Sequence, residues 1–127
     1  TVGGIHRAMP YCFTEHLYPG VPRLNVHTLE PHKPFRVGDI DVLPLRVMHG
    51  KMPIMAYRFG SLAYITDMKT ISDEDRQLLS GVETLVVNAL RWEKPHHSHM
   101  LVDDAIAFAR SVQPYLLHPH DPPVRVP

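Results

Sequence analysis

The middle of the chain alternates between apolar and polar residues, a pattern typical of β-strands with one buried face. "FRVGDIDVLPLRVMH" predicts a hairpin that turns at Gly38-Asp39, with a long second strand ending at His49. "MAYRFGSLAYITD" predicts a second hairpin, joined at Gly60-Ser61. The sequence therefore indicates two antiparallel hairpins in succession.

Helical and short apolar segments follow these hairpins. In "ISDEDRQLLSG", Ser72 is placed to cap a helix with Asp75 three residues on, and Gly81 ends that helix. "TLVVNAL" is short and apolar throughout, as expected of a buried strand. "LVDDAIAFARSV" predicts an amphipathic helix, and "YLLH" predicts a last strand. The apolar stripe of that helix contains Leu101, Ala105, Phe108, Ala109 and Val112.

Proline-rich segments flank this core. "HRAMPYCF" is compatible with a short helix ended by Pro10, and "YPGVPRLNVH" is a connector from which Val26 to Leu29 enter a strand. We divide a single partial domain, residues 1–127, into a proline-rich segment 1–34, a core 35–118 and a proline-rich tail 119–127. The order of hairpins, helix, strand, helix and strand predicts an α/β fold, a mixed sheet with helices on one face.

The composition of the chain argues against several classes of protein. The chain carries 13 basic and 13 acidic residues, so its net charge gives no case for binding nucleic acid or a membrane surface. Its single cysteine excludes an internal disulfide and fits a reducing compartment. No apolar run is long enough for a membrane helix, and the N-terminus lacks the pattern of an export signal. We therefore expect a cytoplasmic protein.

Many of the polar residues that can bind metals follow predicted strands. His49 ends one strand, Asp67 follows "AYIT", Asn88 to His99 with the "HHSH" stretch follow "TLVV", and His118 ends "YLLH". In sheets with helical crossovers the strand ends meet at one edge, where ligand sites form. Imidazole and carboxylate groups suit zinc, manganese or iron. The sequence therefore predicts a metal site at this edge.

Four blocks together resemble the second half of a metallo-β-lactamase-fold hydrolase: "PLRVMHG", "MAYRFGSLAYITDMKTIS", "NALR" and "HHSHMLVDDAIAFARSVQPYLLH". The branch that they resemble contains phosphoribosyl cyclic phosphodiesterases, and the resemblance covers about residues 18–118. It implies half of a four-layer αββα sandwich and hydrolysis of a small cyclic or nucleotide-like phosphodiester. Thioester hydrolysis is the alternative reaction, because the same dinuclear core serves many substrates.

The resemblance also implies a set of metal ligands. His49 matches a histidine ligand of the first metal, Asp67 the carboxylate bridging both metals, and His118 a histidine ligand of the second. The cofactors implied are two divalent ions, zinc or manganese, which activate a water and neutralise the phosphate. Asp67 is thus expected to be essential for catalysis.

The "HHSH" stretch matches a loop beside the scissile phosphate. His99, or alternatively His96, is implied as the proton donor to the leaving alkoxide, and we favour His99. Arg91 and Ser98 are the candidate substrate-binding residues.

Structural interpretations of these residues stay open. His49 is equally compatible with a strand-end histidine bonded to the backbone, and Asp67 with a cap of the turn before Lys69. The "HHSH" stretch is equally compatible with a solvated loop ahead of a helix.

One motif of the family is absent. The family begins with a strand followed by His-x-His-x-Asp-His, and nothing in residues 1–49 matches it. We consider a fragment of a longer protein, a half-domain completed by another chain or by a second copy, and an inactive interaction module. A lone half-sandwich exposes the apolar face that its partner sheet covers, so we expect it to associate.

Overall fold

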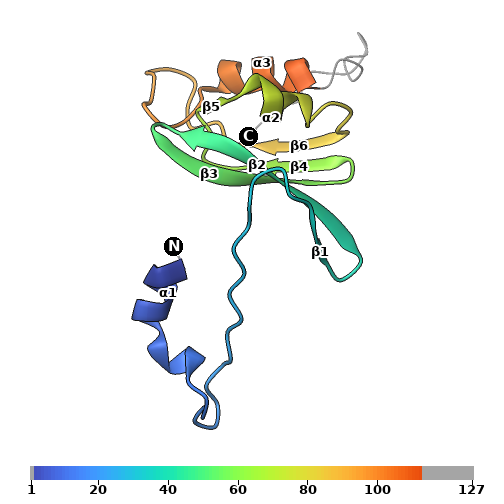
Figure 1. The fold of residues 1–127 in the computed structure, drawn as a ribbon. Helices are drawn as coiled ribbons and strands as arrows, with labels where there is room; N and C mark the ends of the chain where they lie inside the picture. Colours follow the sequence, from blue (N-terminus) through green and yellow to red (C-terminus); the bar gives the residue numbers. More distant parts are fainter. Residues whose placement is uncertain (1, 113–127) are drawn as a thin grey trace. The chain divides into compact units, whose positions relative to one another are not determined.

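The computed structural model describes residues 2–112, which fall into two compact units, one ending at Glu30 and the other beginning at Pro31 (Figure 1). The first unit contains helix α1 (Val2–Ala8) and a short 3₁₀ helix, η1 (Pro10–Phe13). The ring of His6 stacks on that of Phe13 with centroids 3.9 Å apart. The predicted short helix therefore exists, but it ends at Ala8, and Pro10 opens the next turn.

The strand predicted at Val26 to Leu29 is wrong. Residues 23–30 run as irregular chain in the described structure. The apolar residues there alternate as in a strand, but within the first unit no strand lies beside them to complete a backbone ladder.

The second unit contains a mixed sheet with strand order β1-β2-β3-β4-β6, and β5 pairs with β2. The elements in chain order are β1 (Phe35–Val37), β2 (Ile40–His49), β3 (Met52–Phe59), β4 (Leu62–Ile65), β5 (Thr70–Ile71), α2 (Asp73–Gln77), β6 (Thr84–Val87) and α3 (Val102–Val112). Both predicted hairpins are confirmed, as is the Ser72 cap, whose Oγ accepts the Asp75 amide at 3.0 Å. The strand predicted from "YLLH" lies outside the described residues.

The hydrophobic core lies on one face of this sheet, beneath α2 and α3 (Figure 1). Alternate residues of four strands point into it, so Leu45 of β2 and Ile65 of β4 are fully buried. Ala105 and Val112 bring the predicted stripe of α3 onto the same core. The expected α/β half-sandwich, with helices on one face, is the observed fold.

The opposite face of the sheet is partly open. The register places Pro44, Tyr57, Tyr64 and Val86 side by side across β2, β3, β4 and β6. Tyr64 is 47% exposed and Val86 40% exposed. Strand β6 was predicted to be fully buried, and this is wrong, because only Leu85 and Val87 face the core.

A buried carboxylate completes the edge of β2 opposite β3, between the residues that pair with β1 and those that pair with β5. Asp75 is 5% exposed and accepts hydrogen bonds from the amide of Arg46 at 2.9 Å and the hydroxyl of Ser72 at 2.6 Å. The Nε2 atom of His32 lies 2.7 Å from the same carboxylate. Burial by itself raises the pKa of Asp75, but these hydrogen bonds outweigh it and hold that pKa below its ordinary value.

We expect Asp75→Asn to lower the free energy of unfolding by about 2–4 kcal/mol at neutral pH, because it removes the negative charge and one acceptor oxygen and turns an NH₂ group toward the Ser72 hydroxyl. A lowered pKa in the folded state contributes stability above the ordinary value of 3.8, and this contribution is lost as the pH falls. Urea unfolding at neutral pH and about pH 3 should therefore show a smaller acid-induced loss in the variant than in the wild type. Asp41→Asn, which changes an 82% exposed side chain, is the control. Equal losses in wild type and Asp75→Asn would contradict this role.

Candidate metal centre

Three strand ends bring the polar residues together. Because β2 and β4 are both antiparallel to β3, they run parallel to each other, and β6 pairs parallel with β4. The carboxyl ends of β2, β4 and β6 therefore meet at one edge of the sheet. His49 is the last residue of β2, Asp67 follows β4, and Asn88 follows β6.

His49, Asp67 and His99 form a compact cluster at this edge. One potential ligand atom from each lies within 4.8 Å of the other two. The Nδ1 atom of His99 is 3.9 Å from Oδ1 of Asp67, and the rings of His49 and His99 meet edge to face at 4.7 Å between centroids. The Asp67 side chain is 60% exposed and that of His99 21%, so the cluster opens to solvent.

The turn that carries Asp67 is tightly held. Asp67 has a φ of 56°, in the left-handed region that few residues other than glycine adopt. Its carbonyl accepts a hydrogen bond from Nδ1 of His49 at 2.8 Å, and the amide of Lys69 donates to Met48 at 2.7 Å. The amide of Met68 donates to Oδ1 of Asn88, also at 2.8 Å. Such a strained, surrounded residue is characteristic of functional sites.

The histidine loop, residues 91–101, is pinned at both ends. The amide of Leu90 donates a hydrogen bond to the carbonyl of Met100, and the amide of Val102 donates one to the carbonyl of Arg91, both at 3.1 Å. These two hydrogen bonds close the loop. Gly50, in the turn after β2, has a φ of 62°, and a Cβ there would lie 3.4 Å from the carbonyl oxygen of His97. A glycine at this position thus lets the β2–β3 turn approach the loop closely.

His96 lies beside the cluster and packs on His99, with ring centroids 5.1 Å apart. Its Nδ1 atom accepts the amide of Ser98 at 3.3 Å and lies 3.1 Å from the Ser98 hydroxyl. Lost hydration, and then the positive charges of neighbouring groups, hold the pKa of His96 below its ordinary value. These neighbours are His97, His99, Arg91 and His49.

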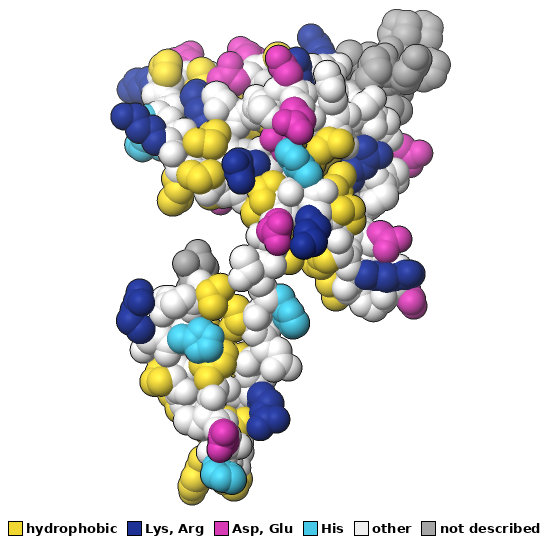
Figure 2. Space-filling model, in the orientation of Figure 1, with side chains coloured by type: hydrophobic (Ala, Val, Ile, Leu, Met, Phe, Trp, Pro, Cys, Tyr) yellow, Lys and Arg dark blue, Asp and Glu magenta, His cyan; other side chains and the backbone are white. Residues whose placement is uncertain are grey.

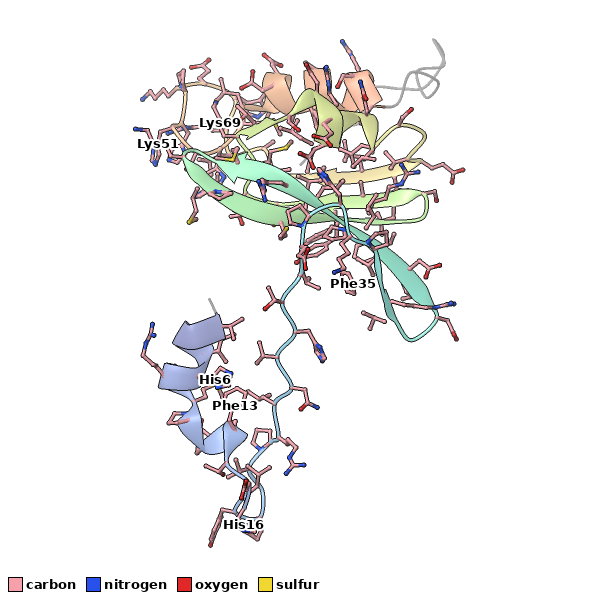
Figure 3. All side chains as sticks on the ribbon, in the orientation of Figure 1. His6, Phe13, His16, Phe35, Lys51 and Lys69 are labelled. Carbon is pink, nitrogen blue, oxygen red and sulfur yellow. The ribbon has the colours of Figure 1, made fainter. Side chains whose placement is uncertain are left out.

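Cationic side chains surround the same end of the domain. Figure 2 shows lysine and arginine side chains gathered with a histidine near the β2–β3 turn. Lys51 lies in that turn and Lys69 follows the strained aspartate, and both are labelled at this end in Figure 3. The Nζ atom of Lys69 also lies 3.9 Å from the Asp104 carboxylate, which offsets part of its charge. The remaining positive charge of this cationic rim favours anionic ligands through long-range electrostatics.

The structure brings together part of the predicted site. His49, Asp67 and His99 form the cluster, and His96 and Ser98 adjoin it. Arg91 is exposed at the start of the histidine loop, whereas His118 lies outside the described residues. His49 is also a strand-end histidine bonded to the backbone, the alternative that the sequence left open, because its Nδ1 donates a hydrogen bond to the carbonyl of Asp67.

The sequence places Asn88 among the polar residues that follow a strand, but we predicted no role for it in the site. Its amide joins the Asp67 turn to His99, whose Nδ1 lies 3.4 Å from Nδ2 of Asn88. The signal that could have found it was its position, directly after β6 at the edge where the other residues converge.

The chemistry of the cluster fits a divalent metal ion. Two imidazoles and one carboxylate are the nitrogen and oxygen ligands that zinc prefers in catalytic sites, and they also suit manganese or iron. Among residues 2–112 this is the one group of histidine, cysteine and acidic side chains close enough to hold an ion. The described residues therefore fit one metal, without a second complete set.

Comparison with known families shows to which superfamily the chain belongs. Residues 1–120 match the beta-lactamase superfamily domain. The chain belongs to this superfamily. It is 41% identical over 102 residues to a protein of Porphyromonas gingivalis (strain ATCC BAA-308 / W83) called octanoyltransferase, and the match covers 80% of the chain. This metallo-β-lactamase-fold chain is also similar to a solved diphosphatase of the PhnP family, with a TM-score of 0.74 and 29% sequence identity over 88% of its length.

This superfamily member spans only part of its relatives. It covers 21% of the octanoyltransferase and 40% of the diphosphatase chain. The match to the octanoyltransferase thus concerns one region of a much longer protein. No helix within residues 2–112 is long and apolar enough to span a lipid bilayer.

Proposed function

We propose that this chain is part of a metal-dependent phosphodiesterase that acts on a small cyclic or nucleotide-like phosphate. The observation that carries the proposal is the cluster of His49, Asp67 and His99 at the converging ends of β2, β4 and β6. The superfamily match, the similarity to a diphosphatase and the cationic rim support an anionic substrate. Zinc or manganese is the cofactor that we assign to the site.

We assign His49 and Asp67 as ligands of a first metal, and Asp67 and His118 as ligands of a second. His49 uses Nδ1 to hold the carbonyl of Asp67, which leaves its Nε2 as the ligand atom, as is usual for histidines that bind metals. Asp67 supplies the one carboxylate of the cluster. A bound divalent ion provides charge neutralisation and lowers the pKa of a bound water.

Protein groups beside the metal site carry the remaining chemistry. His99 donates a proton to the leaving alkoxide, with His96 as the alternative donor. Arg91 and Ser98 contact the phosphate, and the loop that carries them is fixed by its closure at Leu90 and Val102.

We further propose that the complete enzyme includes a second half that carries the missing His-x-His-x-Asp-His motif. The open sheet face with Tyr64 and Val86 is the surface that this half would cover. Two arguments support this: the chain spans only 40% of the diphosphatase, and its described residues contain one cluster of potential ligands, of which we assign only His49 and Asp67 to a metal.

Complementation tests the proposed function. The full chain is assayed with bis(p-nitrophenyl) phosphate and zinc or manganese, alone and with a polypeptide carrying the missing half, and a thioester is tested in parallel. We expect hydrolysis of the phosphodiester in the complemented sample and its loss with Asp67→Asn. Thioester hydrolysis alone would overturn the substrate class. No activity in any sample would favour the rival function, an inactive interaction module, for which the missing motif is the specific support.

The open face also predicts self-association of the isolated chain. We expect Tyr64→Thr combined with Val86→Thr to weaken it at least about tenfold, because truncating an interface tyrosine commonly costs more than 1 kcal/mol. Threonine keeps a high strand propensity, so the sheet should persist. Sedimentation velocity measures the effect, and Tyr18→Thr, at a 79% exposed position outside the sheet, is the control. A wild-type chain that stays monomeric would contradict the prediction.

A further inference from the structure

Asn88 lies between the turn that carries Asp67 and the ring of His99. A hydrogen bond from the amide of Met68 fixes the orientation of its side-chain amide. A backbone N–H can only donate, so the Asn88 atom 2.8 Å from the amide of Met68 must be the oxygen. The NH₂ group of Asn88 therefore faces Nδ1 of His99, at 3.4 Å.

The orientation of Asn88 determines which nitrogen of His99 carries the proton. A donor that faces Nδ1 at 3.4 Å favours a lone pair there, whereas the acceptor Oδ1 of Asp67 is farther from Nδ1, at 3.9 Å. We therefore expect the neutral ring to carry its proton on Nε2. We propose that Asn88 is a positioning residue that locks His99 in the Nε2–H tautomer. In this state neither ring nitrogen offers a lone pair to a metal, because Nδ1 is engaged by Asn88 and Nε2 is protonated.

This tautomer distinguishes between two possible roles of His99, metal ligand and proton donor. The geometry of the cluster alone allows His99 to be a ligand, since one of its nitrogens lies within 4.8 Å of the atoms offered by His49 and Asp67. With Nε2–H fixed, His99 is a hydrogen-bond donor instead, suited to a phosphate oxygen or a leaving alkoxide. The inference rests on the proposed function only for the identity of that acceptor.

The tautomer can be measured without metal, substrate or a second half. Long-range ¹H–¹⁵N correlation spectra of the metal-free full chain, recorded where histidines are neutral, distinguish protonated from unprotonated ring nitrogens. His99→Gln identifies the signals of His99 among those of the ten histidines. We expect an unprotonated Nδ1 and a protonated Nε2 in the wild type. The Nδ1–H tautomer, or an equal mixture of both, would overturn the proposal.

Asn88→Asp is the matched variant. An aspartate still accepts the amide of Met68 but turns a carboxylate oxygen toward His99, so the ring should switch to the Nδ1–H tautomer. Asn25→Asp makes the same change in the first unit and should leave His99 unaltered. If Asn88→Asp does not fold, Asn88→Ala removes the donor without adding charge and should give a mixture of tautomers. A His99 tautomer unchanged in a folded Asn88 variant would overturn the proposal, whether or not phosphodiester hydrolysis is ever detected.

Discussion

Replacing Asp67 by asparagine should reduce phosphodiester hydrolysis by the complemented protein by about 1,000-fold or more, because the metal that it holds contributes several kcal/mol to the transition state. Asparagine is a clean replacement, since it has nearly the same shape and tolerates the left-handed backbone, with a φ of 56°, that Asp67 adopts. The stability of the fold should therefore change little while the ligand is lost.

The measurement for Asp67 is the initial rate with bis(p-nitrophenyl) phosphate at saturating metal. Asp103→Asn, which removes an exposed carboxylate from the first turn of α3, should keep the wild-type rate. Undiminished hydrolysis in Asp67→Asn would show that this aspartate only caps the turn before Lys69, the structural interpretation that the sequence left open.

His99→Gln should produce the second large effect, and it should depend on the leaving group. Loss of a proton donor slows departure of an alkoxide by about 100- to 10,000-fold but matters much less for a nitrophenolate, which leaves without a proton. Metal content should stay at the wild-type level, because we infer that His99 is a proton donor.

Paired rates with an alkyl and a nitrophenyl phosphodiester measure the effect of His99→Gln. His97→Gln is the control, since His97 is exposed and lies two residues before the proposed donor in sequence. Loss of metal from His99→Gln would instead make His99 a ligand. Equal losses with both substrates would assign the residue a role in binding.

The parts of the fold that depend on residues close together in the sequence could be predicted. Both hairpin turns contain glycines with positive φ, 58° at Gly38 and 57° at Gly60, a conformation that glycine adopts without strain. The cap at Ser72 is likewise a contact over three residues, with the amide of Asp75. Such signals lie within one short window of sequence.

Features that depend on distant partners could not be predicted. Strand β5 has only two residues and exists because Ile71 and Thr70 pair with β2. Asp75 fills the gap beside it by accepting the amide of Arg46, a contact over 29 residues. The sequence of β6 indicates burial on both faces, but the described chain supplies helices for one face only.

The position of the candidate residues at one edge of the sheet could be predicted from the sequence, but the contacts that connect them could not. Because strands β2, β4 and β6 run parallel, residues placed after each had to meet at one edge, and His49 and Asp67 do so. The link through Asn88 could not be read from the sequence, because it depends on how two loops approach each other at 2.8 and 3.4 Å.

Metal content tests the central claim most directly. The full chain, purified without chelator and supplied with zinc or manganese, is analysed for bound metal beside Asp67→Asn. Our account predicts about one ion per wild-type chain, with Asp67 as a required ligand, and almost none in the variant. A wild-type chain without metal, or equal metal in both proteins, would contradict it.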